Sequence, residues 1–480
     1  MTSNTSSVSF TVSNKGNPLL ILNDFVYRVK KETVLKKYWI CGINGCNAYI
    51  HTNIQNAFLK SSGEHNHLSD PEALEIKLFR DKLKQRAVHE TTAISKIYEE
   101  EVVKSQFSIQ VLANLPLARE IQPGLTHARR LLTPVLPLSS LFDIPDSYQI
   151  TLKYETFLFS DSLLDRRKRM LLFGSVTQLE ILFDSSTILM DGTFSTTPPF
   201  FDQVFTIHAL KYETSNRTLL CLSKSLLYFL CFPCIFGVLP DLKRTTYQHL
   251  FKILKGLAVS MNRTFKPARV MSDYEASIIT AVVNEFSQAI HSGCSFHFTQ
   301  AIYRRIQSLG LITSYSQDSD IRICCRKLMP LALLPIDQIE TSFYNLRTKS
   351  SAAVKQELHQ LFLYFNHQWI TNVPMKMWSV HGYQHRTNNN CEGFHNRLNQ
   401  RILKAHPNIW TFIKCIQNEE NRFRHLLLQM NAGAQARKKT AATSFIQKRI
   451  DTLNERYKNG EIDVDQLLDG FSLTIAKQKK

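Results

Sequence analysis

The chain has few cysteines, few long apolar runs and no apolar leader, and each shortage excludes a class of protein. Ten cysteines in 480 residues are too sparse for a disulfide scaffold. Cysteines that lie close together in the sequence are therefore better explained as metal ligands, and the others as core residues. The apolar run from Leu226 to Leu239 contains Pro233 and Gly237 and is shorter than the roughly 20 residues of a membrane span. The polar start, Met1 to Ser7, does not resemble a secretory signal. We therefore expect a reducing compartment and no membrane partner.

Acidic residues are also in short supply. The chain has 58 Lys and Arg against 40 Asp and Glu, a formal net charge of +18, which favours a partner rich in phosphates. Charge alone does not separate DNA from RNA or acidic lipid. The basic runs Arg166 to Arg169 and Arg437 to Lys439 fit nuclear import, with solvated helix faces as the alternative.

The chain changes periodicity along its length, and its length and 44% hydrophobic content allow several domains. Strand-like runs at 188–190, 204–210, 235–239 and 268–271 alternate with helical ones, which predicts an α/β sheet covered by helices. The helix after Asp273 is predicted to bury one face, made of Ala276, Ile279, Val282, Val283, Phe286 and Ile290. The expected segments are a disordered N-terminus (1–12), a β-rich unit (13–68), a helical connector (69–165), the first part of the α/β core (166–310), a helical insertion (311–380), a final helical region (381–430) and a basic C-terminal tail (431–480).

The β-rich unit carries the spacing of a zinc site. This unit is too small to be stable without a cross-link such as a disulfide or a bound metal ion. Cys41, Cys46, His65 and His67 form the pattern C-x4-C-x18-H-x-H. Zinc takes four ligands in a tetrahedron, and two short clips of Cys and His supply them with little chain entropy to lose. The alternative is a chance order of these residues, which the Tyr38-Trp39-x-Cys41 context argues against.

Residues 8 to 68 resemble the FLYWCH zinc finger. The resemblance is carried by Phe10, Lys15-Gly16, Leu22, Phe25, Tyr27, Tyr38-Trp39, Cys41, Cys46, Ala48 and His65-Asn66-His67. It implies a small zinc-stabilised β-sheet domain that binds DNA or a protein partner, and we favour DNA. The expected phosphate contacts are Arg28, Lys30, Lys31, Lys36, Lys37 and Lys60. Solvated surface is the alternative for these basic residues.

Three acidic residues stand where elements are expected to begin or end. Asp191 and Asp273 each follow an apolar run, and Glu392 opens a helical segment within Asn388-Asn389-Asn390-Cys391-Glu392-Gly393. Two metal ions held by such carboxylates can cleave a phosphodiester. Each position also has a local explanation: Asp191 precedes glycine in a turn signal, and the other two lie in capping boxes.

Residues 168 to 425 resemble the Mutator-like (MULE) transposases. The motifs that carry the resemblance are Met170 to Gly174, Met190 to Phe194, Phe205 to Ala209, Val238 to Pro240, Thr246-Tyr247, Ser272 to Ala276, Gly293 to Phe298, Gln300, Arg386 to Gly393 and Asn396. The resemblance implies a multidomain α/β chain in which a small β-rich zinc finger precedes an RNase H-like catalytic domain with an all-helical insertion. It also implies a catalytic triad of Asp191, Asp273 and Glu392 that binds Mg²⁺ or Mn²⁺.

Two further groups of residues have open interpretations. Cys294 and His297 match the family and fit a second metal clip, with core packing as the alternative. Trp369, Trp378, Tyr383 and Trp410 fit stacking on extruded bases, although core packing is favoured.

The leading hypothesis is a nuclear MULE-class DNA transposase that binds DNA through its finger and cleaves and joins strands by a two-metal DDE mechanism. One departure from the family pattern favours an alternative: Thr218 to Leu230 adds an apolar stretch. A domesticated or degenerate transposase would act as a zinc-dependent DNA-binding regulator without catalysis. A third hypothesis is a protein-interaction module recruited through the finger. A homo-oligomer and a protein partner of the finger are left open.

Overall fold

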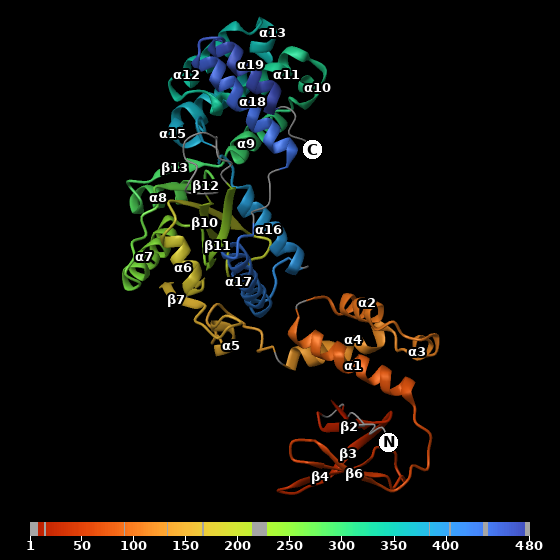
Figure 1. Cartoon of the computed structure of the whole chain (residues 1–480). Helices are drawn as coiled ribbons and strands as arrows, with labels where there is room; N and C mark the ends of the chain where they lie inside the picture. Colours follow the sequence, from red (N-terminus) through yellow and green to blue (C-terminus); the bar gives the residue numbers. More distant parts are fainter. Residues whose placement is uncertain are drawn as a thin grey trace. The chain divides into compact units, whose positions relative to one another are not determined.

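Figure 1 shows a computed structural model of the chain, which divides into two compact units, Met1–Val135 and Leu136–Lys480. The structure describes residues 8–13, 16–90, 92–131, 133–165, 168–213, 228–383, 385–402, 405–434 and 440–475. Three sequence features fall wholly or partly outside these ranges. They are the basic run at 437–439, residues 166 and 167 of the basic run at 166–169, and residues 218–227 of the apolar stretch at 218–230.

The first unit begins with a six-stranded antiparallel sheet in which each strand pairs with the next along the chain. A two-residue turn joins the second and third strands, and its residues Asn23 and Asp24 adopt positive φ angles of 51° and 62°, a conformation that Asn and Asp tolerate. Leu20, Trp39 and Ile50 lie in the small core. The strands are β1 (Ser9–Val12), β2 (Pro18–Leu22), β3 (Phe25–Glu32), β4 (Lys36–Cys41), β5 (Tyr49–Asn53) and β6 (Phe58–Ser62).

A cluster of helices follows in the same unit. Asp70 caps the first helix, because its carboxylate accepts the backbone N–H of Ala73 at 2.8 Å. Phe79, Leu83 and Ile97 share one buried core. The helices are α1 (Pro71–His89), α2 (Ile94–Ser105), α3 (Ile109–Asn114) and α4 (Ala118–Leu131).

The second unit contains a seven-stranded mixed sheet in the order β13-β12-β9-β10-β11-β8-β7. Strands β9, β10 and β11 form an antiparallel meander, whereas β12 runs parallel to β9 and β13 parallel to β12. The four runs predicted as strands fall on β9 to β12. The strands are β7 (Leu158–Asp165), β8 (Lys168–Phe173), β9 (Thr187–Thr193), β10 (Gln203–Glu213), β11 (Tyr228–Leu239), β12 (Arg269–Ser272) and β13 (Ile290–Gly293).

Helices cover both faces of this sheet (Figure 1). Successive residues of a strand point to opposite faces: Leu172 packs with α6 (Val176–Phe183), α7 (Arg244–Ser260) and α8 (Ala276–Glu285). Its neighbours Leu171 and Phe173 pack instead with α16 (Asn389–Ile402), α17 (Ile409–Asn431) and the short α5 (Asp146–Gln149). The two faces are thus buried as the sequence pattern predicts.

The buried face of α8 differs from the predicted one. Ile278, Ala281 and Val282 are buried, whereas Val283 is 54% exposed. Ile290 is not helical at all, because α8 ends at Glu285 and the chain turns to begin β13. The prediction was wrong here because one apolar run continued across the end of the helix into a strand.

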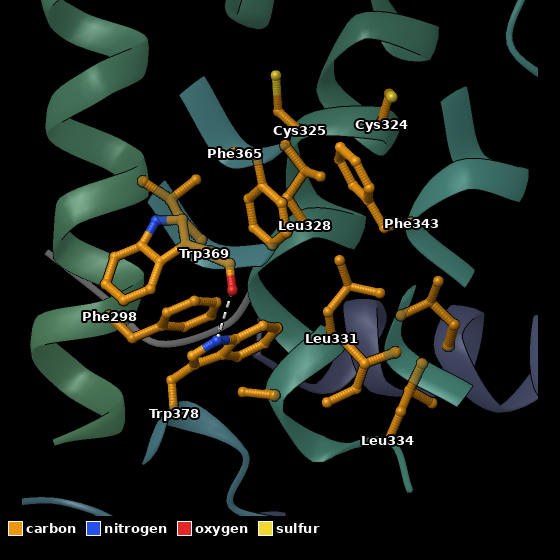
Figure 2. Close-up of a cluster of buried hydrophobic side chains, with 14 of the residues drawn as sticks. Phe298, Cys324, Cys325, Leu328, Leu331, Leu334, Phe343, Phe365, Trp369 and Trp378 are labelled. Carbon is orange, nitrogen blue, oxygen red and sulfur yellow. Dashed lines mark hydrogen bonds between the residues drawn. The ribbon is translucent and has the colours of Figure 1, made fainter. Parts of the chain in front are cut away.

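A helical region follows the sheet and has its own core (Figure 2). Phe298 stacks on Trp378, whose indole N–H donates to the backbone carbonyl of Trp369 at 2.8 Å. Both tryptophans and Trp410 are at most 2% exposed, so core packing, the favoured alternative to base stacking, is their role. The region includes α9 (Ser295–Ser308), α10 (Ile312–Gln317), α11 (Ser319–Leu328), η1 (Met329–Leu333), α12 (Ile336–Lys349), α13 (Ala352–Glu357), α14 (His359–Phe365), η2 (Asn366–Asn372) and α15 (Met375–Trp378).

The C-terminal segment completes this helical core. It contains α18 (Ala441–Lys458) and α19 (Val464–Ile475), in the stretch expected to be a basic tail. Ile450 of α18 and Leu467 and Phe471 of α19 are buried against the insertion. None of the helices in the described ranges is both long and apolar enough to cross a membrane.

Candidate metal centres

The four predicted zinc ligands converge at one end of the N-terminal sheet. Their donor atoms all lie within 4.8 Å of one another. Cys41 Sγ is 3.2 Å from His67 Nε2, Cys46 Sγ is 3.4 Å from His65 Nδ1, and the two ring nitrogens are 3.3 Å apart. Two soft thiols and two imidazoles facing one point are the donor set of a structural zinc site.

Hydrogen bonds around the cluster fix both imidazoles for metal binding. His65 Nε2 lies 2.8 Å from the Tyr27 hydroxyl, and His67 Nδ1 lies 2.9 Å from the Leu68 carbonyl oxygen. When these outer nitrogens donate their protons, the inner nitrogens present lone pairs to the cluster. Phe25 stacks on the His65 ring with centroids 3.6 Å apart. Burial and the neighbouring thiols raise the pKa of Tyr27 to about 12, which keeps its hydroxyl protonated.

Five of the six predicted DNA-contacting residues gather on one face of the finger. A cross-strand row runs from Lys31 through Tyr38 and His51 to Lys60, each paired with the next. Lys36 and Lys60 are close enough to His51 to lower its pKa, together with burial, the largest cause. Lys30 donates to the Tyr49 hydroxyl at 2.9 Å. Exposed cations interleaved with aromatic rings suit a nucleic-acid backbone; the gathered cations are Arg28, Lys30, Lys31, Lys36 and Lys60.

Lys37 is the exception. Side chains alternate along a strand, so Lys37 shares the side of Trp39 and lines a hollow of about 450 Å³ with Phe10. Its ammonium lies 3.5 Å from the Glu32 carboxylate. Lys37 is therefore separated from the basic face that the other five residues form.

Parallel pairing places Asp191 and Asp273 at the same edge of the second sheet. In the register of β12 with β9, Met271 pairs with Leu189. Asp273 and Asp191 each lie two residues further on, at the carboxyl ends of adjacent parallel strands. Such an edge is where α/β sheets carry ligands. Asp191 is buried and Asp273 is partly exposed.

Glu392 reaches this edge from the first turn of α16. Cys391 packs against Leu189 and Met271, which pins the helix start over the two strands. Asn388 fixes the approach: its amide donates to the Met190 carbonyl at 3.0 Å, and its backbone N–H donates to Cys294 Sγ at 3.1 Å. The Asn-rich motif therefore positions Glu392 through packing and hydrogen bonds.

The carboxylates affect one another electrostatically. Burial raises the pKa of Asp273, and the charge of Asp191 raises it further. Burial likewise raises the pKa of Glu392, with Asp191 adding to the shift, although His297 opposes it. Burial and the charge of Asp273 raise the pKa of Glu275 to about 7. Acidic groups buried at one edge are unfavourable without a cation, and carboxylate oxygens are the ligands that Mg²⁺ and Mn²⁺ prefer. Within the described residues, the trio of Asp191, Asp273 and Glu392 is not one of the groups whose donor atoms all lie within 4.8 Å of one another.

Sequence reasoning missed His395, which contacts Asp191 directly. Its Nδ1 lies 3.2 Å from Asp191 Oδ2, and its Nε2 lies 3.0 Å from Thr206 Oγ1, which is itself 3.1 Å from His208 Nε2. This buried chain of hydrogen bonds orients the Asp191 carboxylate. The signal in the sequence was the spacing of His395 three residues after Glu392, which places both on neighbouring positions of one helix.

The second predicted metal-binding pair, Cys294 and His297, also lies at the sheet edge that carries Asp191 and Asp273. Cys294 precedes α9 and His297 lies in its first turn; their donor atoms and that of Glu392 lie within 4.8 Å of one another. His297 Nε2 is 3.4 Å from Glu392 Oε1. A hydrogen bond with Cys294 is the largest cause that raises the pKa of His297 to about 9, with Asp191 and Glu392 contributing.

Comparison with family models identifies two domains in the chain. Residues 10–67 match the FLYWCH zinc finger domain and residues 187–301 match the MULE transposase domain. A search of curated proteins gives no match. The two matches support a transposase-like DNA-binding protein. More particularly, the chain carries an N-terminal FLYWCH zinc finger, whose Cys and His cluster supports a structural zinc ion, and a MULE transposase domain. Glu392 lies beyond the matched MULE residues.

Proposed function

We propose that the chain is a DNA transposase that cleaves and joins phosphodiester bonds at a centre formed by Asp191, Asp273 and Glu392. The observation that carries the proposal is the meeting of these three carboxylates at one sheet edge. They come from the ends of β9 and β12 and from α16, and the charge of Asp191 raises the pKa of both Asp273 and Glu392, which supports a shared centre.

The order of the strands supports an RNase H-like core. Numbered along the chain from β9 to β13, five neighbouring strands of the sheet stand in the order 3-2-1-4-5, with the first three antiparallel and the fourth and fifth parallel to the first. This arrangement brings the first acidic residue, on strand 1, beside the second, after strand 4. The helices between β13 and α16, joined by α18 and α19, would form the insertion of such a domain.

Each residue of the centre has a definite role in this proposal. Asp191 and Asp273 would hold the metal pair from the sheet and Glu392 would hold one ion from the helix. Bound Mg²⁺ or Mn²⁺ would activate the attacking nucleophile and stabilise the leaving oxygen. His395 would keep Asp191 in one orientation, and burial would limit competing water.

The FLYWCH finger would bring DNA to this centre. Its basic face, Arg28, Lys30, Lys31, Lys36 and Lys60, would contact phosphates, whereas the zinc cluster would hold the sheet in shape. The net charge of +18 supports a nucleic-acid partner, and a chain acting on chromosomal DNA would work in the nucleus.

The test is nicking of supercoiled plasmid DNA by the purified full chain with Mg²⁺ or Mn²⁺. We expect nicked product with the wild-type chain and none with Asp191→Asn. Lys37→Ala, a change in the other unit at a cation outside the basic face, is the control and should cut normally. If the wild-type chain binds DNA but does not cut it with either metal, the non-catalytic DNA-binding regulator is the better description.

A further inference from the structure

The side chains of Cys294, His297 and Glu392 form a cluster that the triad chemistry does not require. Their donor atoms lie within 4.8 Å of one another, and His297 Nε2 is 3.4 Å from Glu392 Oε1. Within the described part of the chain, Glu392 Oε1 is a buried atom that makes no hydrogen bond and has the His297 ring as its neighbour. Burying polar atoms unsatisfied is costly, and a cation would satisfy such a cluster.

The kinds of donor select a particular metal. Magnesium takes oxygen ligands in an octahedron and has little affinity for sulfur, whereas zinc binds thiolate, imidazole and carboxylate readily. Three protein ligands leave the fourth tetrahedral position for water or a substrate oxygen. The cluster therefore suits Zn²⁺ better than the Mg²⁺ that carboxylates alone would bind.

The backbone holds two of these ligands in place before any metal arrives. Cys294 precedes α9 and His297 lies one helical turn further, so both side chains emerge from the same side of the helix start. The backbone N–H of Asn388 donates to Cys294 Sγ at 3.1 Å, which holds the sulfur beside the start of α16. The same Asn388 precedes α16, which supplies Glu392. Through Asn388, the Cys294 sulfur is thus hydrogen-bonded to the start of the helix that carries Glu392.

We propose that Cys294, His297 and Glu392 bind a Zn²⁺ ion, and that this ion inhibits DNA cleavage by taking Glu392 away from the catalytic metal pair. Zinc binding depends only on the three side chains, whereas the inhibitory consequence rests on the proposed transposase function. Because one carboxylate would serve both sites, zinc would compete with the catalytic pair for Glu392.

Zinc stoichiometry of the full chain tests the binding step without any need for activity. After dialysis against micromolar zinc, metal analysis should give two equivalents in the wild-type chain, one from the finger and one from the cluster. Cys294→Ser and Glu392→Gln should each retain one equivalent, with unchanged circular dichroism. The matched control is Cys324→Ser, the same change at a buried cysteine of the helical region, and it should keep two.

Cobalt provides a second readout of the same site. Titration with Co²⁺ should give two steps of thiolate-to-cobalt absorption, and only the weaker step should vanish in Cys294→Ser. A single equivalent of zinc in the wild-type chain, or two in folded Cys294→Ser and Glu392→Gln, would overturn the proposal. Nicking plays no part in this result, so failure of the zinc site and failure of the proposed function remain distinguishable.

The inhibitory step is tested by adding zinc to the nicking reaction at fixed Mg²⁺. Each variant is compared with its own rate in the absence of zinc. Loss of one ligand should raise the half-inhibiting zinc concentration in Cys294→Ser by about tenfold or more. Equal zinc sensitivity of the wild-type chain and Cys294→Ser would show that zinc acts elsewhere.

Discussion

The zinc cluster of the finger and the proposed carboxylate centre are built in opposite ways. The four ligands of the finger lie within 27 consecutive positions, from Cys41 to His67, and the outer nitrogens of both histidines have hydrogen-bond partners. The carboxylate centre draws on positions 191, 273 and 392, and it retains buried polar atoms without partners in the described structure. A closed cluster whose polar atoms all have partners stabilises a fold, whereas a cluster with unpartnered polar atoms is able to bind a cation or a substrate.

The largest expected effect separates the two centres by stability. Cys46→Ser, or zinc chelation, should unfold the finger, because structural zinc contributes about 10 kcal/mol or more to such small domains. Limited proteolysis should then degrade residues 10–67 while the second unit stays intact. Cys415→Ser, which changes a buried cysteine of α17, is the control. A protease-resistant finger in Cys46→Ser would contradict a structural role for zinc.

Removing a carboxylate should have the reverse effect on stability. The pKa of Asp273 is raised by burial and by Asp191, so at neutral pH the charged form is less favourable in the folded chain than in the unfolded one. Asp273→Asn removes that charge. Thermal unfolding in the absence of divalent cations should therefore show an equal or higher Tm, together with loss of nicking. A clear fall in Tm would mean that Asp273 has a structural role.

A smaller effect is expected on the finger's DNA affinity. Replacing both Lys31 and Lys60 by alanine removes two cations from the basic face, so the slope of log affinity against log salt should fall by about 2. Lys37→Ala, on the other side of the strand, should leave the slope nearly unchanged. Fluorescence anisotropy with a labelled duplex measures both. Equal effects of the two variants would place the DNA elsewhere on the finger.

The smallest expected effects concern residues that orient a metal ligand. His395→Ala should weaken Mn²⁺ binding by about 10- to 100-fold, because Asp191 loses its hydrogen bond. Tyr27→Phe should have a comparable effect on zinc affinity of the finger, where it removes the partner of His65. Restoration of most Mn²⁺ affinity by His395→Asn would separate orientation of Asp191 from general loss of structure. No change of affinity in either alanine or phenylalanine variant would remove the orienting role.

The contrast also shows what the sequence could predict. The zinc ligands were found because their spacing is local and each clip is short. The carboxylates were found through family motifs, since 201 positions separate Asp191 from Glu392 and spacing alone does not join them. His395 was missed because its partner, Asp191, is remote from it in the sequence and belongs to another element. The packing of α18 and α19 was missed because a charged segment with widely spaced apolar residues, such as Ile450 and Leu467, resembles a solvated tail.

The most direct test of the account is the number of Mn²⁺ ions that the full chain binds when zinc fills the finger alone, one equivalent per chain, measured by electron paramagnetic resonance without DNA. The account predicts two Mn²⁺ sites that Mg²⁺ displaces, and loss of both in Asp191→Asn, because that carboxylate is expected to contact each ion. Equal Mn²⁺ binding by the wild-type chain and Asp191→Asn would contradict the claim that Asp191, Asp273 and Glu392 form one metal centre.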